Sequence, residues 1–275
     1  MRASLEIWSL SAGRSQVVLE TDLHIEAPNW DPSGDCLLVN AGGRLFRVPL
    51  GGGEPVAVET GFADRCNNDH GISQDGRQIV LSHHVEGGSA IFLMDAAGGL
   101  PRRVTEHAPS WWHGWSSDGA RLAYVAARGD RRAIDVYTIG GGGGEETRLT
   151  QGEGHCDGPD YSADGSLIYY NCDRDGHAQI WVMNTDGSDQ RKLFADDHVN
   201  WFPHPSPDGR YLVYLAYPPE TLGHPADRPV ALCLCDPEGG NRRRLVEFNG
   251  GQGTINVPSW SPDGSAFAFV RYGAV

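Results

Sequence analysis

The chain has 275 residues and a formal net charge of −14, because 36 acidic side chains outnumber 22 basic ones. A nucleic-acid partner is not expected, since binding to phosphates requires clustered Lys and Arg. A membrane span is not expected either, because no window approaches about 20 apolar residues, and the first ten residues lack the apolar core of a secretory leader. We therefore expect a cytoplasmic protein, or a periplasmic one if a leader has been removed.

One turn signature, Ser-x-Asp-Gly with Asp-Pro-Ser-Gly in its first copy, recurs along the whole chain. The six copies are 31–34, 73–76, 116–119, 162–165, 206–209 and 261–264, and their glycines lie 42, 43, 46, 44 and 55 residues apart. Such a period is typical of propeller blades. In each turn the Asp can bond to the backbone ahead, and the Gly can adopt the positive φ that reverses a strand.

The strands predicted around these turns make four-stranded blades. At the N-terminus, residues 5–10 and 16–19 predict a third and a fourth strand with no first or second before them. Complete repeats follow, in which two apolar runs such as 122–126 and 134–137 precede a glycine turn and a short fourth strand. At the C-terminus, residues 258–260 and 266–270 predict only a first and a second strand. We therefore predict an all-β, six-bladed β-propeller in one domain, 1–275, closed by pairing the N-terminal outer strands with the C-terminal inner ones.

Two segments carry a family resemblance that covers essentially the whole chain. Trp260-Ser-Pro-Asp-Gly264 and the segment 173–187, Asp-Arg-Asp-Gly-His-Ala-Gln-Ile-Trp-Val-Met-Asn-Thr-Asp-Gly, resemble the propeller repeats of TolB-like proteins, also called PD40 or WD40-like repeats. The resemblance implies the fold rather than a function. The periplasmic protein that names the family has a leader and an N-terminal α/β domain, which we do not expect here, so its role in the cell envelope is not carried over.

The six cysteines are scattered through the chain. They stand at positions 36, 66, 156, 172, 233 and 235. Cys233 and Cys235 lie two apart on one predicted strand, which is poor disulfide geometry. We expect all six to be reduced thiols.

The residues just before the turns are expected to converge at the mouth of the central channel. The turns themselves belong to the bottom face, whereas all eleven histidines fall in segments assigned to the top face. Counting back from each turn places on the innermost strands Glu26, Asn29, Asn68, His70, Trp111, His113, Asp157, Asp160, Trp201, His204 and Asn256. Loops on a rigid scaffold commonly carry binding groups. Indoles beside acids and amides suit a saccharide, so we predict a small polar ligand of that kind, or a peptide, at the top face.

A metal site is one interpretation of the mouth. His70, His113 and His204, with Asp69, Asp157 or Asp160, offer imidazole and carboxylate ligands for Mn, Fe, Ni or Zn. No His-x-His spacing occurs, so such a site would be assembled from separate blades, and the alternative is that these histidines only form hydrogen bonds. A calcium loop at 173–176 is the weaker candidate, because it lacks the closing Glu and reads as a strand-connecting turn.

A second resemblance points to catalysis. His204-Pro-Ser206 is similar to a segment of the oligogalacturonate lyases, which are metal-dependent, seven-bladed enzymes that cleave uronates by β-elimination. The resemblance implies a base such as His113 or His204, and Asp157 is a further catalytic candidate, although Phe202 stands where that family has another histidine. A binding module and a saccharide-active enzyme therefore both remain open, and the insert at 217–229 is a candidate lid over the mouth.

Overall fold

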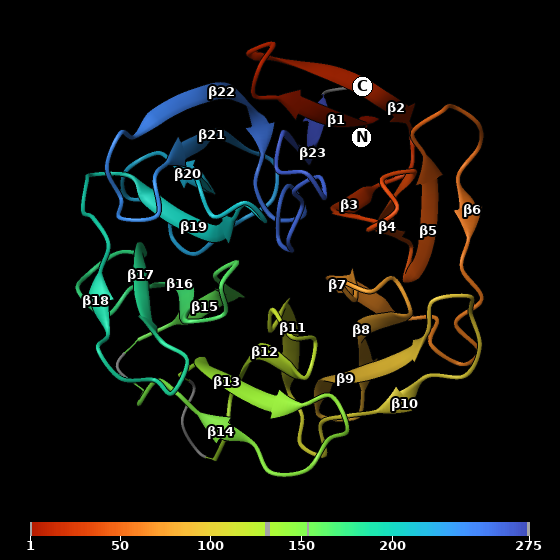
Figure 1. The fold of residues 1–275 in the computed structure, drawn as a ribbon, viewed down its shortest axis with the longest axis horizontal. Helices are drawn as coiled ribbons and strands as arrows, with labels where there is room; N and C mark the ends of the chain where they lie inside the picture. The colour runs from red at the N-terminus through yellow and green to blue at the C-terminus, as the bar shows by residue number, and fades with distance from the viewer. Residues whose placement is uncertain (1, 130–132, 153, 274–275) are drawn as a thin grey trace.

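The computed structural model describes residues 2–129, 133–152 and 154–273, and these form six β-sheets arranged as a ring (Figure 1). Five sheets contain four antiparallel strands, and the sixth contains three. No helix occurs among the described residues, and none there could cross a membrane. The prediction of an all-β, six-bladed propeller is confirmed.

The two inner positions of the blades surround the channel. The innermost strands are β3 (Ile25–Trp30), β7 (Cys66–Ile72), β11 (Ser110–Trp115), β15 (Cys156–Tyr161) and β19 (Val199–Pro205). The second strands are β4 (Cys36–Ala41), β8 (Gln78–Val85), β12 (Arg121–Ala126), β16 (Leu167–Cys172), β20 (Leu212–Tyr217) and β23 (Ala266–Gly273). Most second-strand residues are buried, because blades pack on both of their faces.

The two outer positions lie toward the rim of the ring in Figure 1. The third strands are β1 (Arg2–Ser9), β5 (Arg44–Pro49), β9 (Gly88–Asp95), β13 (Asp135–Gly140), β17 (Gln179–Asn184) and β21 (Arg228–Cys235). The fourth are β2 (Arg14–Thr21), β6 (Val56–Ala57), β10 (Arg102–Arg103), β14 (Thr147–Arg148), β18 (Arg191–Lys192) and β22 (Arg243–Gly250). Four of these six outer strands have only two residues, which keeps exposed sheet edges short.

The ring closes in the predicted way. Strand β1 pairs with β23 from Arg2↔Gly273 to Ser9↔Ala266, so the two ends of the chain share one blade. The innermost position of that blade is the segment before the last turn, where Trp260 bridges to Phe267 and Ala268 N–H donates to Ser259 O at 2.8 Å. The first and last parts of the chain are therefore both needed for this blade.

The repeated turns are built by their own side chains. In the copy at 73–76, Ser73 Oγ donates to Asp75 Oδ1 at 2.6 Å and accepts from Gln78 N–H at 2.9 Å. Asp75 Oδ1 also accepts from Arg77 N–H at 3.0 Å, and Gly76 has a φ of +72°. The same bonds recur in the four later copies, so the prediction from the signature is confirmed.

Apolar side chains fill the space between neighbouring blades. One cluster joins Val80 and Ile91 of the second blade to Tyr124 and Ile139 of the third. Burying one such side chain contributes about 1.5–3 kcal/mol. This packing fixes the blades against one another and gives the channel rigid walls.

Candidate functional site

A β-bulge interrupts every described innermost strand just before its turn. The register shifts lie between Glu26 and Asn29, Cys66 and His70, Trp112 and Gly114, Asp157 and Asp160, and Trp201 and His204. Ala27, Gly158 and Phe202 have positive φ at these points. A bulge bends its strand and redirects side chains, so these bulges determine which residues face the channel.

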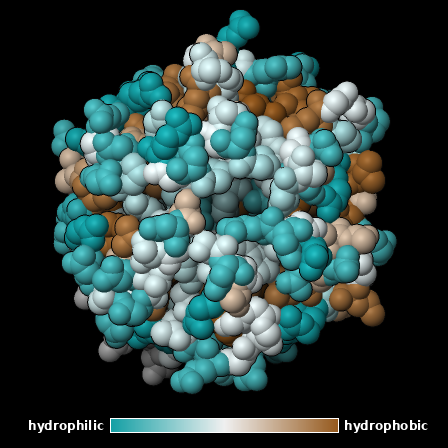
Figure 2. All heavy atoms as spheres, in the orientation of Figure 1, coloured by the Kyte–Doolittle hydropathy of each residue, from teal (hydrophilic) through white to brown (hydrophobic). Residues whose placement is uncertain are grey.

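The mouth of the channel holds a cavity of about 410 Å³. Figure 2 shows a hollow at the centre of the ring, where the innermost strands of Figure 1 converge. Six predicted site residues line this cavity: Glu26, Asn68, Trp111, His113, Asp157 and Asn256. They come from five of the six blades. The structure therefore brings together about half of the predicted set.

The other five predicted residues lie elsewhere. Asn29 and Asp160 line a second cavity, of about 330 Å³, on the side of the repeated turns. His70, Trp201 and His204 are buried and line neither cavity. Trp201 lies behind the wall of the mouth because His224 covers it, with 4.4 Å between the ring centroids.

The imidazole of His113 contacts two other blades across the central channel. Its Nε2 lies 2.9 Å from Asp157 Oδ1 in the next blade, and its Nδ1 lies 3.2 Å from Asn256 O, in the blade on the far side of the ring. Both neighbouring atoms are acceptors, so the imidazolium form satisfies both contacts. Burial is the largest single influence and lowers the pKa of His113, but the charge and hydrogen bond of Asp157, with the charge of Asp69 and the contact to Asn256, together raise it to about 8.

Asp157 is the carboxylate on which three histidines converge. Its Oδ2 lies 3.2 Å from His155 Nε2 and 3.6 Å from His224 Nε2. Burial would raise the pKa of Asp157, but His113 and His155 outweigh burial and hold it well below its usual range. Asp157 is therefore ionised at neutral pH.

A chain of polar side chains runs along one side of the cavity. His24 Nε2 lies 3.5 Å from Glu26 Oε1, which accepts from Asn68 Nδ2 at 3.1 Å. Asn68 Oδ1 accepts from Gln252 Nε2 at 3.3 Å, and Gln252 Oε1 is hydrogen-bonded to His224 Nδ1. Burial opposes ionisation of Glu26, but the hydrogen bonds from His24 and Asn40 lower its pKa.

Asp69 is the third carboxylate in the cavity. Its side chain is buried, and burial together with the charges of Asp157 and Glu26 raises the pKa of Asp69 to about 7. Its backbone N–H donates to Asn67 Oδ1 at 3.1 Å. A buried acid that titrates near neutral pH inside a cavity is typical of functional sites.

The predicted metal ligands are held by other residues of the protein. His204 lies between Asp160 Oδ2, 3.0 Å from its Nδ1, and Ile255 O, 2.7 Å from its Nε2. His70 Nε2 lies 3.2 Å from Asn40 Oδ1, and burial lowers the pKa of His70 to about 3. Within the described residues, the group whose ligand atoms gather as a metal would require is instead His155, Asp157 and His224.

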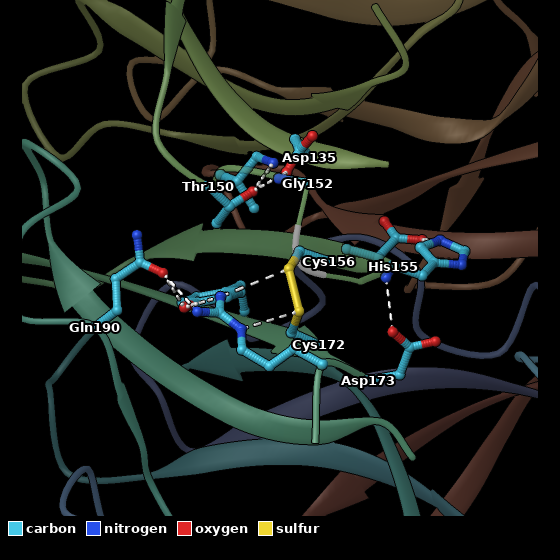
Figure 3. Close-up of a disulfide and its surroundings, with 12 residues drawn as sticks. Asp135, Thr150, Gly152, His155, Cys156, Cys172, Asp173 and Gln190 are labelled. Atoms are coloured by element: carbon cyan, nitrogen blue, oxygen red, sulfur yellow. Dashed lines mark hydrogen bonds and ion pairs between the residues drawn. A yellow bond between two sulfur atoms is a disulfide. The ribbon is translucent and has the colours of Figure 1, made fainter. Parts of the chain in front are cut away.

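The expectation of six reduced cysteines is wrong. Cys156 and Cys172 form a disulfide between β15 and β16, directly beside His155 (Figure 3). The bulge in β15 brings the two cysteines opposite one another, which their scattered positions in the sequence did not indicate. Tyr161↔Ile168 would place residue 173 opposite Cys156 in a regular hairpin, whereas the extra residue shifts the pairing to Cys156↔Cys172. Cys36, Cys66, Cys233 and Cys235 are free, as expected.

The segment that carries His155 is anchored on both sides. His155 N–H donates to Asp173 Oδ1 at 2.7 Å, and Gly152 N–H donates to Asp135 Oδ1 at 2.7 Å (Figure 3). Thr150 Oγ1 donates to the same Asp135 oxygen. These bonds and the neighbouring disulfide fix the position of His155 at the mouth.

Several lining residues lie outside the set predicted from the ring: Asn67, Asp69, Val125, Ile134, His155, Phe202, His224 and Gln252. His224 belongs to the insert between β20 and β21, whose Pro225 O accepts from Tyr217 Oη at 3.2 Å. The insert therefore reaches the mouth, as a lid would require. Phe202 takes the place expected for Trp201, because the bulge turns it toward the channel. The histidine content of the top loops was the signal for His155 and His224.

The chain resembles proteins of one family over its whole length. A model of the TolB β-propeller domain matches residues 107–221. An uncharacterised protein of Agrobacterium fabrum is 47% identical over 274 residues, which are 99% of this chain and 93% of the relative. A solved structure of a TolB-like protein from Agrobacterium tumefaciens superposes with a TM-score of 0.97 at 47% identity, over 100% of this chain and 99% of the other.

A likeness to the lyases is also present, at the level of fold. An oligogalacturonate lyase in complex with manganese gives a TM-score of 0.58 at 16% identity, over 90% of this chain and 74% of the lyase. Identity this low shows a shared propeller architecture and carries no activity across.

Proposed function

The chain belongs to the family of TolB-like β-propeller proteins, and from this premise we propose that it is a binding module whose ligand site is the cavity at the mouth of the channel. The fold itself does not select a ligand. The proposal therefore depends on the chemistry of the cavity walls.

Asp69 is the observation that carries the proposal. Its carboxylate is buried in the cavity, and its pKa is raised to about 7 by burial and by the neighbouring acids. Burying an acid with so little support costs stability. A ligand that donates hydrogen bonds to Asp69 would offset that cost. A binding role therefore accounts for the buried carboxylate.

The cavity walls favour a neutral or cationic ligand. Glu26, Asp69 and Asp157 line the cavity, and no Lys or Arg does so among the described residues. Trp111 and Phe202 add flat apolar surface on which the C–H face of a sugar ring can pack. We therefore propose a small polyhydroxylated or amine-bearing ligand, such as a neutral saccharide or the amino end of a peptide.

A thermal-shift screen on metal-free protein tests this proposal. A ligand that binds only the folded state raises the melting temperature. We expect a rise with neutral saccharides, amino sugars or short peptides and none with uronates, which the acidic walls repel. Trp111→Ala should remove the rise, whereas Gln74→Ala, in the second cavity, should not.

Two outcomes would contradict the proposal. One is a panel in which only uronates raise the melting temperature, since this would favour the lyase-like interpretation. The other is a rise that persists unchanged in Trp111→Ala, because the ligand would then bind elsewhere.

A further inference from the structure

We propose that His155 Nε2, Asp157 Oδ2 and His224 Nε2 together bind one divalent transition-metal ion of the Zn²⁺ type at the edge of the mouth cavity. These three atoms lie within 4.8 Å of one another. These three ligands differ from the metal ligands predicted from the sequence. Asp157 is the one residue that the two sets share. The metal site does not depend on the proposed small ligand, because metal binding is measured without one.

The two oxygens of Asp157 have separate partners. Oδ1 lies 2.9 Å from His113 Nε2 and accepts from Gly158 N–H at 2.7 Å, which fixes the plane of the carboxylate. Oδ2 is directed at His155 and His224. Metal-binding carboxylates are commonly oriented by such a second layer of hydrogen bonds. Asp157 is therefore held with one oxygen available to a metal.

The polar chain from Glu26 determines which nitrogen of His224 carries a proton. Asn68 Nδ2 donates to the Glu26 carboxylate, so Asn68 Oδ1 is the atom that accepts from Gln252 Nε2. Gln252 Oε1 then remains as an acceptor, and His224 Nδ1 must donate to it. In the neutral ring the lone pair lies on Nε2, which faces Asp157 Oδ2 at 3.6 Å.

His224 Nε2 and Asp157 Oδ2 are then two electron-rich atoms that face one another without a proton between them. A bound cation would convert this repulsion into two coordination bonds. The opposite nitrogen of a metal-bound histidine usually donates to an oxygen acceptor, which is the role of Gln252 here. We regard this lone pair, directed at Asp157 Oδ2, as the second indication of a metal.

The two distances to Asp157 suit a tetrahedral ion. Zn²⁺ bonds of roughly 2.0–2.2 Å to nitrogen and oxygen place neighbouring ligand atoms about 3.4 Å apart. The distances of 3.2 Å from His155 Nε2 and 3.6 Å from His224 Nε2 to Asp157 Oδ2 lie on either side of that value. All three residues line the cavity, so the fourth position would open into it.

Isothermal titration of untagged, chelator-treated protein with ZnCl₂ tests the proposal, with the Co²⁺ absorption spectrum as a second readout. We expect one equivalent of tightly bound Zn²⁺ and a Co²⁺ spectrum of four-coordinate type. His155→Phe and His224→Phe should abolish both signals. Gln252→Ala should weaken Zn²⁺ binding by roughly 10–100-fold, as the loss of an outer partner does.

Phe is chosen because it keeps an aromatic ring at each position. The His224 ring packs on Trp201 and Phe202, with 4.4 Å and 5.1 Å between the ring centroids. Unchanged circular dichroism would show that each variant folds. His84→Ala, an exposed histidine outside the cavity, is the control and should bind Zn²⁺ as the wild type does.

The absence of a Zn²⁺ equivalent in wild-type protein, or its retention in the two Phe variants, would overturn the proposal. Because the thermal-shift screen is done on metal-free protein, its result and the Zn²⁺ titration separate the two proposals. Ligand binding without Zn²⁺ binding would contradict only the metal site, and Zn²⁺ binding without any ligand would contradict only the binding module.

Discussion

His113 and Asp157 form an ion pair between two neighbouring blades, with 2.9 Å between Nε2 and Oδ1. Both side chains are buried, and His113 also contacts Asn256 O across the channel. This single ring therefore connects three blades at the floor of the mouth cavity.

Replacing His113 with Gln should destabilise the protein. The change leaves the Asp157 carboxylate buried without its main partner, and loss of one member of a buried pair costs about 3–5 kcal/mol. Urea unfolding measures the difference. His84→Gln, at an exposed position, should leave the free energy of unfolding unchanged; equal stabilities for wild type and His113→Gln would show that the pair contributes nothing.

The disulfide between Cys156 and Cys172 predicts four free thiols. Alkylation of the unfolded, unreduced protein, followed by mass spectrometry, should label Cys36, Cys66, Cys233 and Cys235 only. Cys172→Ser should lower the free energy of unfolding by about 3 kcal/mol, because the closed loop has 16 residues of separation. Six labelled cysteines would contradict the bond.

The blade architecture was predictable because each repeat contains the turn residues that fix the pairing of its own first two strands. The side chains of Ser73 and Asp75 bond to residues no more than five positions away, so the signature predicts the same local structure in every copy. The half blades at the two ends then determine how the ring closes. Local chemistry and a fixed period were sufficient for the fold.

The site was predictable only where the ring repeats. Glu26, Asn68 and Asp157 line the mouth as counting from the turns indicated. The bulges alter the register beyond that point, which placed Cys172 opposite Cys156 and moved Phe202 into the cavity. His224 lies in the insert between β20 and β21, which has no counterpart in other blades, and Gln252 lies in the link after β22, outside the counted positions.

The repeated turns should be sensitive to their glycine in a way that depends on conformation alone. Gly76 has a φ of +72° and open space where a Cβ would lie, so Gly76→Ala should cost about 1–2 kcal/mol through backbone strain. Gly51 has the same open space without a positive φ, and Gly51→Ala should be nearly neutral. Thermal unfolding of both variants distinguishes them; equal losses would exclude conformation as the cause.

Asp69 should make stability depend on pH. Its pKa is about 7 in the folded protein, against an ordinary value of 3.8, so the folded state holds a proton that the unfolded state releases. The contribution of Asp69 to stability therefore falls as the pH rises from about 4 to 7 and stays low above that range. Asp69→Asn removes this dependence, and its advantage over the wild type should grow from near zero at pH 4 to about 4 kcal/mol at pH 8.

The same variant gives the most direct test of the proposed binding site. The melting temperature of wild type and Asp69→Asn is measured at pH 8, each with and without the ligand that gives the largest shift in the screen. We predict that Asp69→Asn melts at a higher temperature than wild type without ligand and gains little or nothing when the ligand is added. A variant that melts lower than wild type, or one that keeps the full ligand-induced rise, would contradict the account.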